Sequence, residues 1–506
     1  MRAQAQIVSV EDAIAQIPDG ATVAVGGFVG AAHPEALTSE IERQWLLRQA
    51  PRDLTLLYAA GQGDGKSRGL NHLAHEGLVR RVIGGHWNLA PRMGRLALEN
   101  RIEAYNFPQG VISVLFREIA ARRPGVFTRV GMNTFIDPNN GGGRLNARTI
   151  EPLVERVVLG GEEWLWYHAV PIHVGMVRGT RADRRGNISF EREGIIGEVL
   201  PIAQAAKNHG GIVIAQVEEI VNCISDPKSV RIPGLLVDYV VVSNPSQHEQ
   251  TFAETFNPAY VSHENTVEPQ HFQWSERTVI GRRALCEIRR GDIANLGIGL
   301  PEMVAVAARE AGTFDDFTLT VESGPIGGVP ASGLSFGCSA APEAIIDQPS
   351  QFDFYDGGGL DIAVLGAVEI DEEGSVCVSC FGERFAGVGG FVNIASHARR
   401  VVFCSTFRAS GLKVASDGAS LRIVTEGQHC KFVPRVRQVC FHGPSALGQG
   451  QEVLYVTERA VFRLTPRGLQ LEEIAPGISV ESVLAGMEFK PLVESVRAMP
   501  LSCFKP

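Results

Sequence analysis

A single carboxylate stands where a β-forming run meets a turn rich in glycine and proline. Residues 317–321 read Phe-Thr-Leu-Thr-Val, Glu322 follows them, and residues 323–330 then form a Gly/Pro-rich turn. A carboxylate at the carboxyl end of a strand lies where open α/β sheets bind ligands. Surrounded by glycine-exposed amides, Glu322 could act as a nucleophile whose adduct carries an oxyanion stabilised by N–H groups. Taken alone, the pattern fits a surface glutamate that caps a turn equally well.

Three glycine clusters could complete such a site. Gly297 and Gly299 join a predicted strand to a helix N-terminus, where amide donors and the helix dipole favour anions. The tetrapeptide Gly-Gly-Phe-Val occurs twice, at residues 26–29 and again at 389–392, where Gly387 precedes it. Each cluster alone also fits tight packing of a strand on a helix. Together they suggest that glycine-rich segments surround one carboxylate on two sides.

Two better-known motifs are present only in part. Residues 60–67 nearly form a phosphate-binding P-loop, but the first position is Ala60, and the next strand has no acidic residue to hold magnesium. A surface turn or an anion-contacting loop is favoured there. Residues 333–337 match the nucleophile elbow of serine hydrolases, which requires a preceding strand. Pro330 cannot lie in a central strand, so Ser335 is disfavoured as a nucleophile.

The pair Cys377 and Cys380 forms a CxxC motif within residues 375–381, which we interpret as a strand. Residues three apart on a strand point to opposite faces. No second CxxC and no histidine pair lies nearby to complete a zinc site. We therefore expect buried, structural cysteines and no metal.

The elements that must position these residues alternate along the chain. Short β-branched runs, amphipathic helix-length runs and glycine-containing junctions are typical of α/β architecture. We expect helices at residues 11–17, 70–79, 111–121 and 301–311. We expect strands at 22–25, 54–58, 81–83, 212–217, 239–242, 293–296, 317–321, 362–365 and 401–404.

Internal echoes indicate a duplication. The hairpin-like turn at residues 183–188 is repeated at 371–376, with glycine where positive φ is needed. Comparing the spacing of the echoes gives the first copy an insertion of about 80 residues. Residues 243–276 are polar and aperiodic, which indicates a linker. The earlier echo consists of Ala13, Ile17, Gly20 and Pro34-Glu35, matched by Ala284, Ile288, Gly291 and Pro301-Glu302.

We therefore predict an α/β protein of two tandem, related, open Rossmann-like domains, at residues 1–270 and 277–506, with the active site between them. In open doubly wound sheets the ligand crevice lies at strand ends, and pockets form preferentially at domain interfaces.

Composition narrows the class of protein. The chain has 506 residues, a formal net charge of −9, and 56 glycines without a collagen-like period. The absence of a basic excess argues against general nucleic-acid binding. No apolar stretch is long enough for a membrane span or a signal peptide, and nine cysteines, an odd number mostly within apolar segments, suit a reducing cytoplasm.

The ordered motifs resemble family I coenzyme A transferases in their fused single-chain form, such as propionate or acetate CoA-transferases and 3-oxoacid CoA-transferases. The resemblance covers essentially the whole chain, and the near-P-loop falls inside a family motif without ATP chemistry. The motifs that carry it lie at residues 25–28, 33–35, 63–66, 71–72, 75–77, 81–87, 108–110, 135–138, 141–143, 322–324 and 387–391.

The resemblance implies a ping-pong transfer of CoA from a short-chain acyl-CoA to a carboxylic acid, with Glu322 as the nucleophile that becomes a glutamyl-CoA thioester. It implies that Gly26, Gly27 and Phe28 offer amides to the oxyanion and that Gln109 helps to place the reacting carboxylate. It also implies that Gly297, Gly299, Gly387 and Gly389 approach CoA.

No metal or cofactor is expected, because CoA is a substrate. A homodimer or homotetramer is expected from the resemblance. One departure stands out: relatives commonly have Asn-Val-Asn-Val-Ser where this chain has Ser375-Val376-Cys377-Val378-Ser379. An acyl-CoA hydrolase, acting through Ser335 or through water at the Glu322 adduct, is the alternative, and a CoA-sensing module without turnover is a third reading.

Overall fold

The computed structural model describes residues 5–263, 273–382 and 384–505. Contacts divide the chain into two compact units. Unit 1 comprises Met1–Thr266, Val321–Asp353 and Arg384–Asn393, and unit 2 comprises Val267–Thr320, Phe354–Glu383 and Ile394–Pro506. Two segments of the second sequence half thus belong to unit 1. The units are interleaved along the chain, whereas the domains proposed at 1–270 and 277–506 are continuous sequence halves, and that division stays a prediction. Part of the expected linker, residues 264–272, lies outside the described residues.

Unit 1 contains an eight-stranded sheet in which all neighbouring strands are parallel. The chain runs outward from β2 through β3 and β4 to β5, then returns to β9 on the other side of β2. The strand order therefore reverses between β2 and β9, the kind of position where open α/β sheets bind ligands. In spatial order the strands are β1 (Gln6–Ile7), β15 (Tyr239–Val242), β12 (Ile212–Val217), β9 (Val174–Arg178), β2 (Thr22–Val25), β3 (Leu54–Tyr58), β4 (Val79–Gly84) and β5 (Glu103–Asn106).

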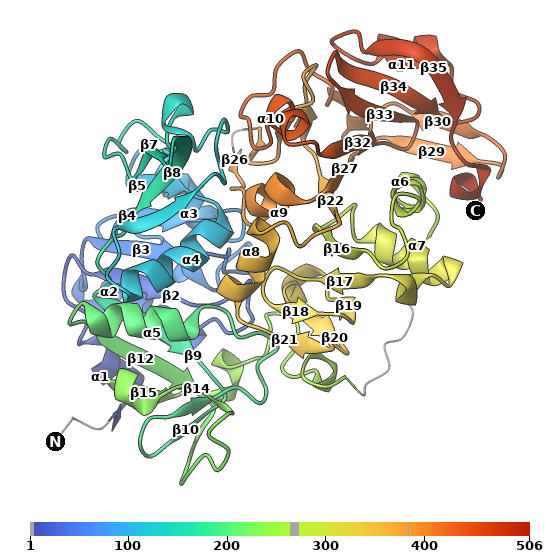
Figure 1. Cartoon of the computed structure of the whole chain (residues 1–506). Helices are drawn as coiled ribbons and strands as arrows, with labels where there is room; N and C mark the ends of the chain where they lie inside the picture. The colour runs from blue at the N-terminus through green and yellow to red at the C-terminus, as the bar shows by residue number, and fades with distance from the viewer. Residues whose placement is uncertain (1–4, 264–272, 383, 506) are drawn as a thin grey trace. The chain divides into compact units, whose positions relative to one another are not determined.

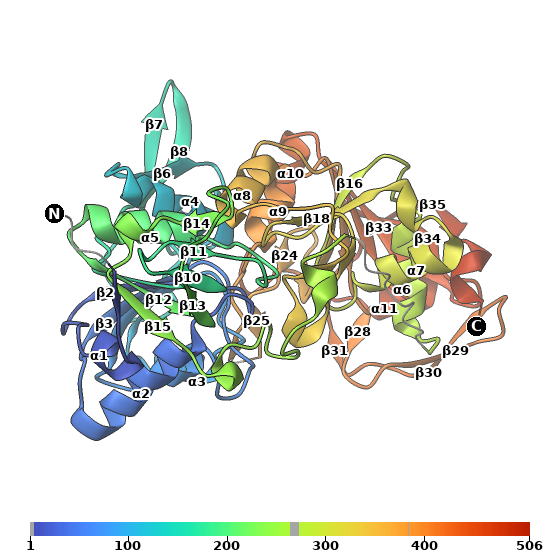
Figure 2. The ribbon, with the colours of Figure 1, turned by 90° about the horizontal axis from the view of Figure 1, so that it is seen from below.

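Helices cover both faces of this sheet (Figures 1 and 2). Helices α1 (Val10–Ile14), α2 (Glu35–Arg48) and α3 (Pro91–Leu98) share a buried apolar cluster with one face of the strands. Helices α4 (Gln109–Ala120) and α5 (Val199–Asn208) contact each other, and α5 packs on β9 and β12. Figure 2 shows α4 and α5 on the side of the sheet opposite α1–α3.

Smaller sheets and further antiparallel strand pairs also belong to unit 1. The sheet β6-β8-β7 is antiparallel, and its β7–β8 hairpin stands out from the unit in Figure 2. It lies within the region of the predicted insertion. The strands of this sheet are β6 (Gly125–Thr128), β7 (Val154–Leu159) and β8 (Glu162–His168). A four-stranded sheet consists of β13 (Glu219–Val221), β10 (Arg181–Asp183), β11 (Ile188–Ser189) and β14 (Val230–Ile232). Two further antiparallel pairs are β18 (Pro325–Ile326) with β21 (Ala344–Ile345) and β19 (Val329–Pro330) with β20 (Ser339–Ala340).

Unit 2 repeats the central order of unit 1 on a smaller scale. Its strand β16 (Ile293–Leu296) lies between β17 (Thr318–Thr320) and β22 (Ile362–Gly366), as β2 lies between β3 and β9, and these pairings are parallel. Beyond β22 come β27 (Arg400–Cys404), β32 (Glu452–Val456), β33 (Ala460–Thr465), β34 (Gly468–Ile474) and β35 (Leu492–Ala498).

The remaining helices are α6 (Glu276–Leu285), α7 (Met303–Ala311), α8 (Gln348–Asp356), α9 (Phe391–His397), α10 (Gly443–Gly448) and α11 (Val480–Ala485), and the remaining strands are β23 (Glu369–Ile370), β24 (Val376–Cys377), β25 (Cys380–Phe381), β26 (Arg384–Phe385), β28 (Arg408–Ala409), β29 (Lys413–Ser416), β30 (Leu421–Thr425) and β31 (His429–Cys430).

The echoed turns make the same hydrogen bonds. The Gly186 N–H donates to the Asp183 carbonyl at 2.9 Å, and the Gly374 N–H donates to the Asp371 carbonyl at 3.0 Å. Both glycines have positive φ, +83° and +75°. In each copy the aspartate carboxylate also accepts two backbone amides of its own turn. The same local sequence therefore closes the β10–β11 and β23–β24 hairpins.

The α/β class predicted from the sequence is confirmed, and the predicted strands coincide with β2, β3, β12, β15 and β16 to the residue. The helix predicted at residues 70–79 is wrong. Only Leu70–Leu73 forms a short 3-10 helix, because Gly77 takes φ +87° and β4 begins at Val79. The histidines of this segment bind the carboxylates of Glu35 and Glu42 on α2.

Candidate functional site

Four loops meet the carboxyl edge of the unit 1 sheet. They follow β2, β3, β4 and β5 at residues 26–29, 59–62, 85–87 and 107–109. The strands are parallel, so these loops leave the sheet at the same edge, next to the reversal of strand order. Four predicted site residues from the first sequence half lie in them: Gly26, Gly27, Phe28 and Gln109.

The loop after β2 has one amide left for a ligand. The Gly26 N–H donates to the Met176 carbonyl at 3.1 Å, and the Phe28 N–H donates to the Ala31 carbonyl at 2.9 Å. These two amides are therefore engaged within the protein, contrary to the expectation that all three face an oxyanion. In the part of the chain that the structure describes, the Gly27 N–H has no acceptor.

Gly27 itself cannot carry a side chain. Its φ is +135°, and a Cβ there would lie 2.9 Å from the Cα of His33. Behind the loop, the Gln62 amide donates to the Val25 carbonyl at 3.0 Å, and its Oε1 lies 2.6 Å from the His33 Nδ1. Burial lowers the pKa of His33 to about 4, because its effect is larger than that of the nearby Glu35 carboxylate, which raises the pKa. The ring is therefore neutral at neutral pH. A neutral, buried network thus braces the loop.

Glu322 lies on a tight turn just beyond β17, as the sequence predicts. The Gly324 N–H donates to the Val321 carbonyl at 2.9 Å, and the Val321 N–H donates to the Pro325 carbonyl at 2.9 Å. Glu322 is 8% exposed, so the residue is largely buried.

The Glu322 turn is tied to the loop after β2. The Ser323 hydroxyl donates to the Gly337 carbonyl. A Cβ on Gly337 would lie 2.5 Å from the Phe28 ring, and the Phe28 and Phe336 ring centroids are 5.6 Å apart. A segment of the second sequence half, which includes the Glu322 turn, therefore packs against Phe28 of the first Gly-Gly-Phe loop.

A second segment of the second half, residues 386–389, docks against the loops after β4 and β5. A Cβ on Gly387 would lie 2.9 Å from the Cα of His86, so only glycine fits at this contact. Among the described residues, five hydrogen bonds hold the segment: Trp87 N–H to Ala386 O at 2.8 Å, Asn88 N–H to Ala386 O at 3.1 Å, Gly389 N–H to Gly85 O at 2.8 Å, Gln109 N–H to Gly389 O at 2.9 Å, and Val388 N–H to Asn106 Oδ1 at 3.1 Å.

Unit 1 thus brings together seven of the nine predicted site residues: Gly26, Gly27, Phe28, Gln109, Glu322, Gly387 and Gly389. Gly297 and Gly299 belong to unit 2, between β16 and α7. Gly299 has φ +88° and open space where a Cβ would stand.

The partial motifs have structural explanations. In the near-P-loop, the Asp64 carboxylate accepts hydrogen bonds from the backbone amides of Lys66 and Ser67 at 2.8 Å each, so these amides are already bonded within the protein. The Ser335 hydroxyl donates to Glu254 at 2.7 Å and lies 2.9 Å from the Thr251 hydroxyl. In the described residues no histidine contacts Ser335, as a serine nucleophile would require.

The interpretation of residues 375–381 as one strand is wrong. A bend at Ser379 separates β24 from β25, and the Cys377 and Cys380 thiols converge instead of pointing apart. Their sulfurs lie 3.9 and 3.7 Å from the Ser379 hydroxyl, and Cys440 donates to the same oxygen at 3.2 Å. A chain bend can do this because the alternation of faces holds only in an extended strand.

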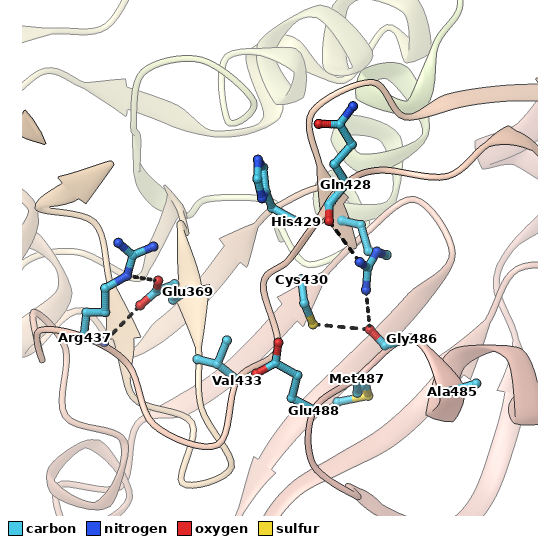
Figure 3. A pocket seen from close by; sticks show the side chains of 11 residues that line it. Glu369, Gln428, His429, Cys430, Val433, Arg437, Ala485, Gly486, Met487 and Glu488 are labelled. Carbon is cyan, nitrogen blue, oxygen red and sulfur yellow. Dashed lines mark hydrogen bonds and ion pairs between the residues drawn. The ribbon is translucent and has the colours of Figure 1, made fainter. Parts of the chain in front are cut away.

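A cavity of about 480 Å³ lies elsewhere, in unit 2 (Figure 3). Arg437 turns toward Glu369 there, at 2.6 Å, and Arg408 is occupied by backbone carbonyls of Gly427, Gln428 and Gly486. None of the predicted site residues lines this cavity.

In the described ranges, no cluster of three or more His, Cys, Asp or Glu side chains is arranged to hold a metal ion. None of the helices in the same ranges combines the length and apolar character that crossing a bilayer requires.

The sequence reading gave no individual role to His86, Gln62 or His33. Their positions in the sequence could have pointed to the site, because each of the three residues lies in or beside a segment that directly follows a strand of the sheet. Their mutual contacts depend on folding and have no signature in the sequence.

The open parallel sheet, with a reversal of strand order between β2 and β9, is typical of α/β proteins that bind a ligand at the carboxyl ends of their strands. Residues 7–243 match a protein-family profile described as Coenzyme A transferase. The chain is 40% identical over 493 residues to Acetate CoA-transferase YdiF of Escherichia coli (strain K12), which covers 96% of this chain and 92% of that protein. The chain therefore belongs to the coenzyme A transferase family and is a CoA-transferase.

Further similar proteins support membership of the same family. The chain is 43% identical over 503 residues to Caffeate CoA-transferase of Acetobacterium woodii, covering 97% of this chain and 95% of that protein. The solved apoenzyme structure of acyl-CoA transferase YdiF from Escherichia coli O157:H7 matches with a TM-score of 0.95 and 39% identity, over 100% of this chain and 97% of that chain. A YdiF structure described as a thioester complex with CoA matches with a TM-score of 0.94 and 40% identity, over 99% of this chain and 96% of that one.

Proposed function

We propose that this protein transfers CoA from a short-chain acyl-CoA to a carboxylic acid by a ping-pong reaction through Glu322. The observation that carries the proposal is the Glu322 turn, anchored by Ser323 and Gly337 against the Gly-Gly-Phe loop. These contacts hold the Glu322 turn against Phe28, in the loop that contains Gly27, at the sheet edge where α/β proteins bind ligands.

The proposed reaction has two symmetrical halves. The Glu322 carboxylate attacks the acyl-CoA carbonyl, which forms a mixed anhydride and releases the CoA thiolate. The thiolate then attacks the glutamyl carbonyl, which forms a glutamyl-CoA thioester and releases the donor acid. An acceptor carboxylate reverses both steps. One thioester replaces another, so no ATP, metal or organic cofactor is needed in this scheme.

The surrounding groups support these steps. The Gly27 N–H, which has no acceptor within the described residues, would donate to the tetrahedral oxyanion, while the bonded amides of Gly26 and Phe28 hold the loop. Gln109 would hold the reacting carboxylate. Gly387, Gly389, Gly297 and Gly299 would contact CoA, whose long non-reacting part can supply binding energy for the strained anhydride.

The proposal extends to the class of carboxylic acid, the cellular location and the oligomeric state. One relative is named an acetate and another a caffeate CoA-transferase, so a related site accepts carboxylic acids of different size. We propose a short carboxylic acid such as acetate or propionate for this chain, a cytoplasmic location and a homodimer or homotetramer. A panel of acyl-CoA donors and acceptors would rank the acids directly.

The decisive experiment traps the adduct. The enzyme is incubated with acetyl-CoA without acceptor, treated with hydroxylamine or borohydride, and digested for mass spectrometry. Modification of the peptide at Glu322 is expected. An unmodified Glu322, under conditions where acetyl-CoA is consumed, would contradict the proposal.

An acyl-CoA hydrolase is the competing function. Ser335→Ala removes the only nucleophile that alternative offers besides the Glu322 adduct, and it should leave transfer largely intact. Thioester hydrolysis measured without acceptor should stay far slower than exchange measured with propionate. Loss of activity in Ser335→Ala, with Glu322→Ala still active, would favour a serine hydrolase.

A further inference from the structure

Three cysteine thiols of unit 2 converge on the side chain of Ser379. The Cys377 and Cys380 sulfurs lie 3.9 and 3.7 Å from the Ser379 Oγ, and the Cys440 thiol donates to the same oxygen at 3.2 Å. The Cys377 sulfur is also hydrogen-bonded to both other thiols. All three cysteines are free, so three reduced sulfurs surround one hydroxyl group.

The hydrogen bonds between these thiols favour the loss of one proton. Donation by the Cys380 and Cys440 thiols lowers the pKa of Cys377, because a thiolate accepts a hydrogen bond better than a thiol does. The Cys380 thiol donates to Cys377 and is partly desolvated, which raises the pKa of Cys380, so the pair shares one negative charge. The Arg437 guanidinium also favours the charged form of Cys380. A thiolate is the form of cysteine that attacks disulfides.

One of these three cysteines is appreciably exposed to solvent. Cys377 and Cys440 are 0% and 1% exposed, whereas Cys380 is half-buried, so an external reagent meets Cys380 first. The bend at Ser379 turns the Cys377 and Cys380 thiols toward each other. Because their sulfurs are already in hydrogen-bond contact, only a short approach separates them from the length of a disulfide bond, about 2.05 Å.

We propose that Cys377 and Cys380 are a redox-active pair, which small disulfides such as glutathione disulfide oxidise to a reversible intramolecular disulfide. Proton transfer along the hydrogen bond places the negative charge on Cys380, and its thiolate attacks one sulfur of glutathione disulfide. A mixed disulfide forms and one glutathione thiolate leaves. The Cys377 sulfur then attacks the Cys380 sulfur, loses its proton to that thiolate, and displaces the second glutathione, which is protonated from solvent. The two cysteines lose two electrons, and one glutathione disulfide becomes two glutathione molecules.

Such a bond has the properties of a reversible modification rather than of a structural bridge. It closes a ring through only two intervening residues, Val378 and Ser379. A disulfide that closes a short loop restricts the unfolded chain little and so adds little to stability. Disulfides that form and break in a reducing compartment are typically regulatory or catalytic. The inference is independent of the proposed function, because no step of the CoA transfer uses these cysteines.

The test is a redox titration of the whole protein. Wild-type protein is equilibrated with glutathione and increasing glutathione disulfide, quenched with acid, alkylated with N-ethylmaleimide in denaturant and cleaved after glutamate. The peptide at residues 374–383 contains Cys377 and Cys380, whereas Cys440 and Cys223 fall in separate peptides, at 427–452 and 220–249. Mass spectrometry then distinguishes a bond within the first peptide from a bond between peptides and from a glutathione adduct.

We expect the peptide at 374–383 to lose two hydrogen atoms and to escape alkylation at a glutathione disulfide concentration at least ~10-fold below that which half-modifies Cys223, because the second thiol is already in contact. The exposed Cys223 is the internal reference and should carry a glutathione adduct. Dithiothreitol should restore both alkylation sites. In Cys377→Ser the second thiol is absent, so Cys380 should accumulate the glutathione adduct. Cys440→Ser is the matched control and should still form the bond.

Alkylation of both Cys377 and Cys380 under conditions that fully modify Cys223 would overturn the inference. So would a bond that joins the peptide at 374–383 to the peptide at 427–452 through Cys440, or a stable glutathione adduct on Cys380 in the wild type. The wild-type titration requires no substitution, so it decides the question even if Cys377→Ser does not fold. Trapping of the Glu322 adduct involves none of these cysteines, so its failure would overturn the proposed function instead.

Discussion

Glu322 sits on a turn whose shape is set by backbone groups. Its neighbours Val321 and Gly324 close the turn, and Ser323 anchors it to the Gly337 carbonyl. The backbone at Glu322 is thereby held in place by hydrogen bonds of its own turn and of the Ser323 hydroxyl. Such preorganisation is what an oxyanion-forming nucleophile needs.

Glu322→Gln should reduce exchange at least ~1000-fold, because an amide cannot form the anhydride or the thioester. Exchange between acetyl-CoA and propionate, followed by chromatography of the CoA esters, measures it. Thermal unfolding should change little, since the amide has the same shape. Residual exchange above one-tenth of wild type would show that another group is the nucleophile.

The buried His33 makes the stability of the folded protein depend on pH in the acid range. Its pKa is about 4 in the folded protein because of burial, against 6.5 for the free side chain. Between these values the unfolded chain binds a proton and the folded chain does not, so stability is lost as pH falls from 6.5 toward 4.

The free energy of unfolding should therefore drop by about 2 kcal/mol through His33 between pH 6.5 and 5. In His33→Gln this component should vanish. Urea unfolding of both proteins at the two pH values measures the difference. Equal pH sensitivity in the two proteins would show that His33 is not the group responsible.

At the scale of elements, the segment 386–389 works as a short backbone clamp. It hydrogen-bonds to the loops after β4 and β5 and presses Gly387 against His86. A glycine is required there by a neighbour more than 300 residues earlier in the chain, so the requirement belongs to the contact between elements.

Gly387→Ala should lower kcat/KM by up to about 100-fold, because the clamp must shift to admit the methyl group. Gly411→Ala is the matched control: its φ of +86° is close to the +79° of Gly387, but a Cβ there meets open space. The control should lose some stability and keep its activity. Comparable activity loss in both variants would trace the effect to backbone strain alone.

At the scale of the whole molecule, unit 1 is completed by residues 321–353 and 384–393 of the second half. The first half alone would expose the apolar cluster that contains Phe28 and Ile195, because Phe336 and Cys338 cover part of it.

Residues 1–270 expressed alone should therefore be inactive and bind an apolar dye. Co-expression with residues 271–506 should restore exchange to within roughly tenfold of the intact chain, since binding of the second fragment offsets the exposed surface. Purification of the pair through a tag on one fragment, followed by the exchange assay, measures this. Full activity of the first fragment alone would contradict the assignment of Glu322.

Much of the architecture follows from local sequence. The strands β2, β3 and β12 coincide with the predicted ranges, and the repeated hairpins follow from their Asp and Gly positions. Local patterns suffice there because strand burial and turn closure involve residues close in sequence. The same local reasoning gives the wrong element at residues 70–79, where a histidine forms hydrogen bonds with carboxylates of α2. It also gives the wrong element at Cys377–Cys380, because the chain bends between the two cysteines.

The sequence by itself determined the family resemblance, the α/β class and the identity of Glu322 as the candidate nucleophile, because these depend on motifs written in consecutive residues. Only the tertiary structure decided that, among the described residues, the Gly27 amide has no acceptor while the amides of Gly26 and Phe28 do, and that residues 386–389 dock against His86 and Gln109. The physical reason is that hydrogen-bond partners and close contacts arise between residues that are distant in the chain, and only folding brings them within reach.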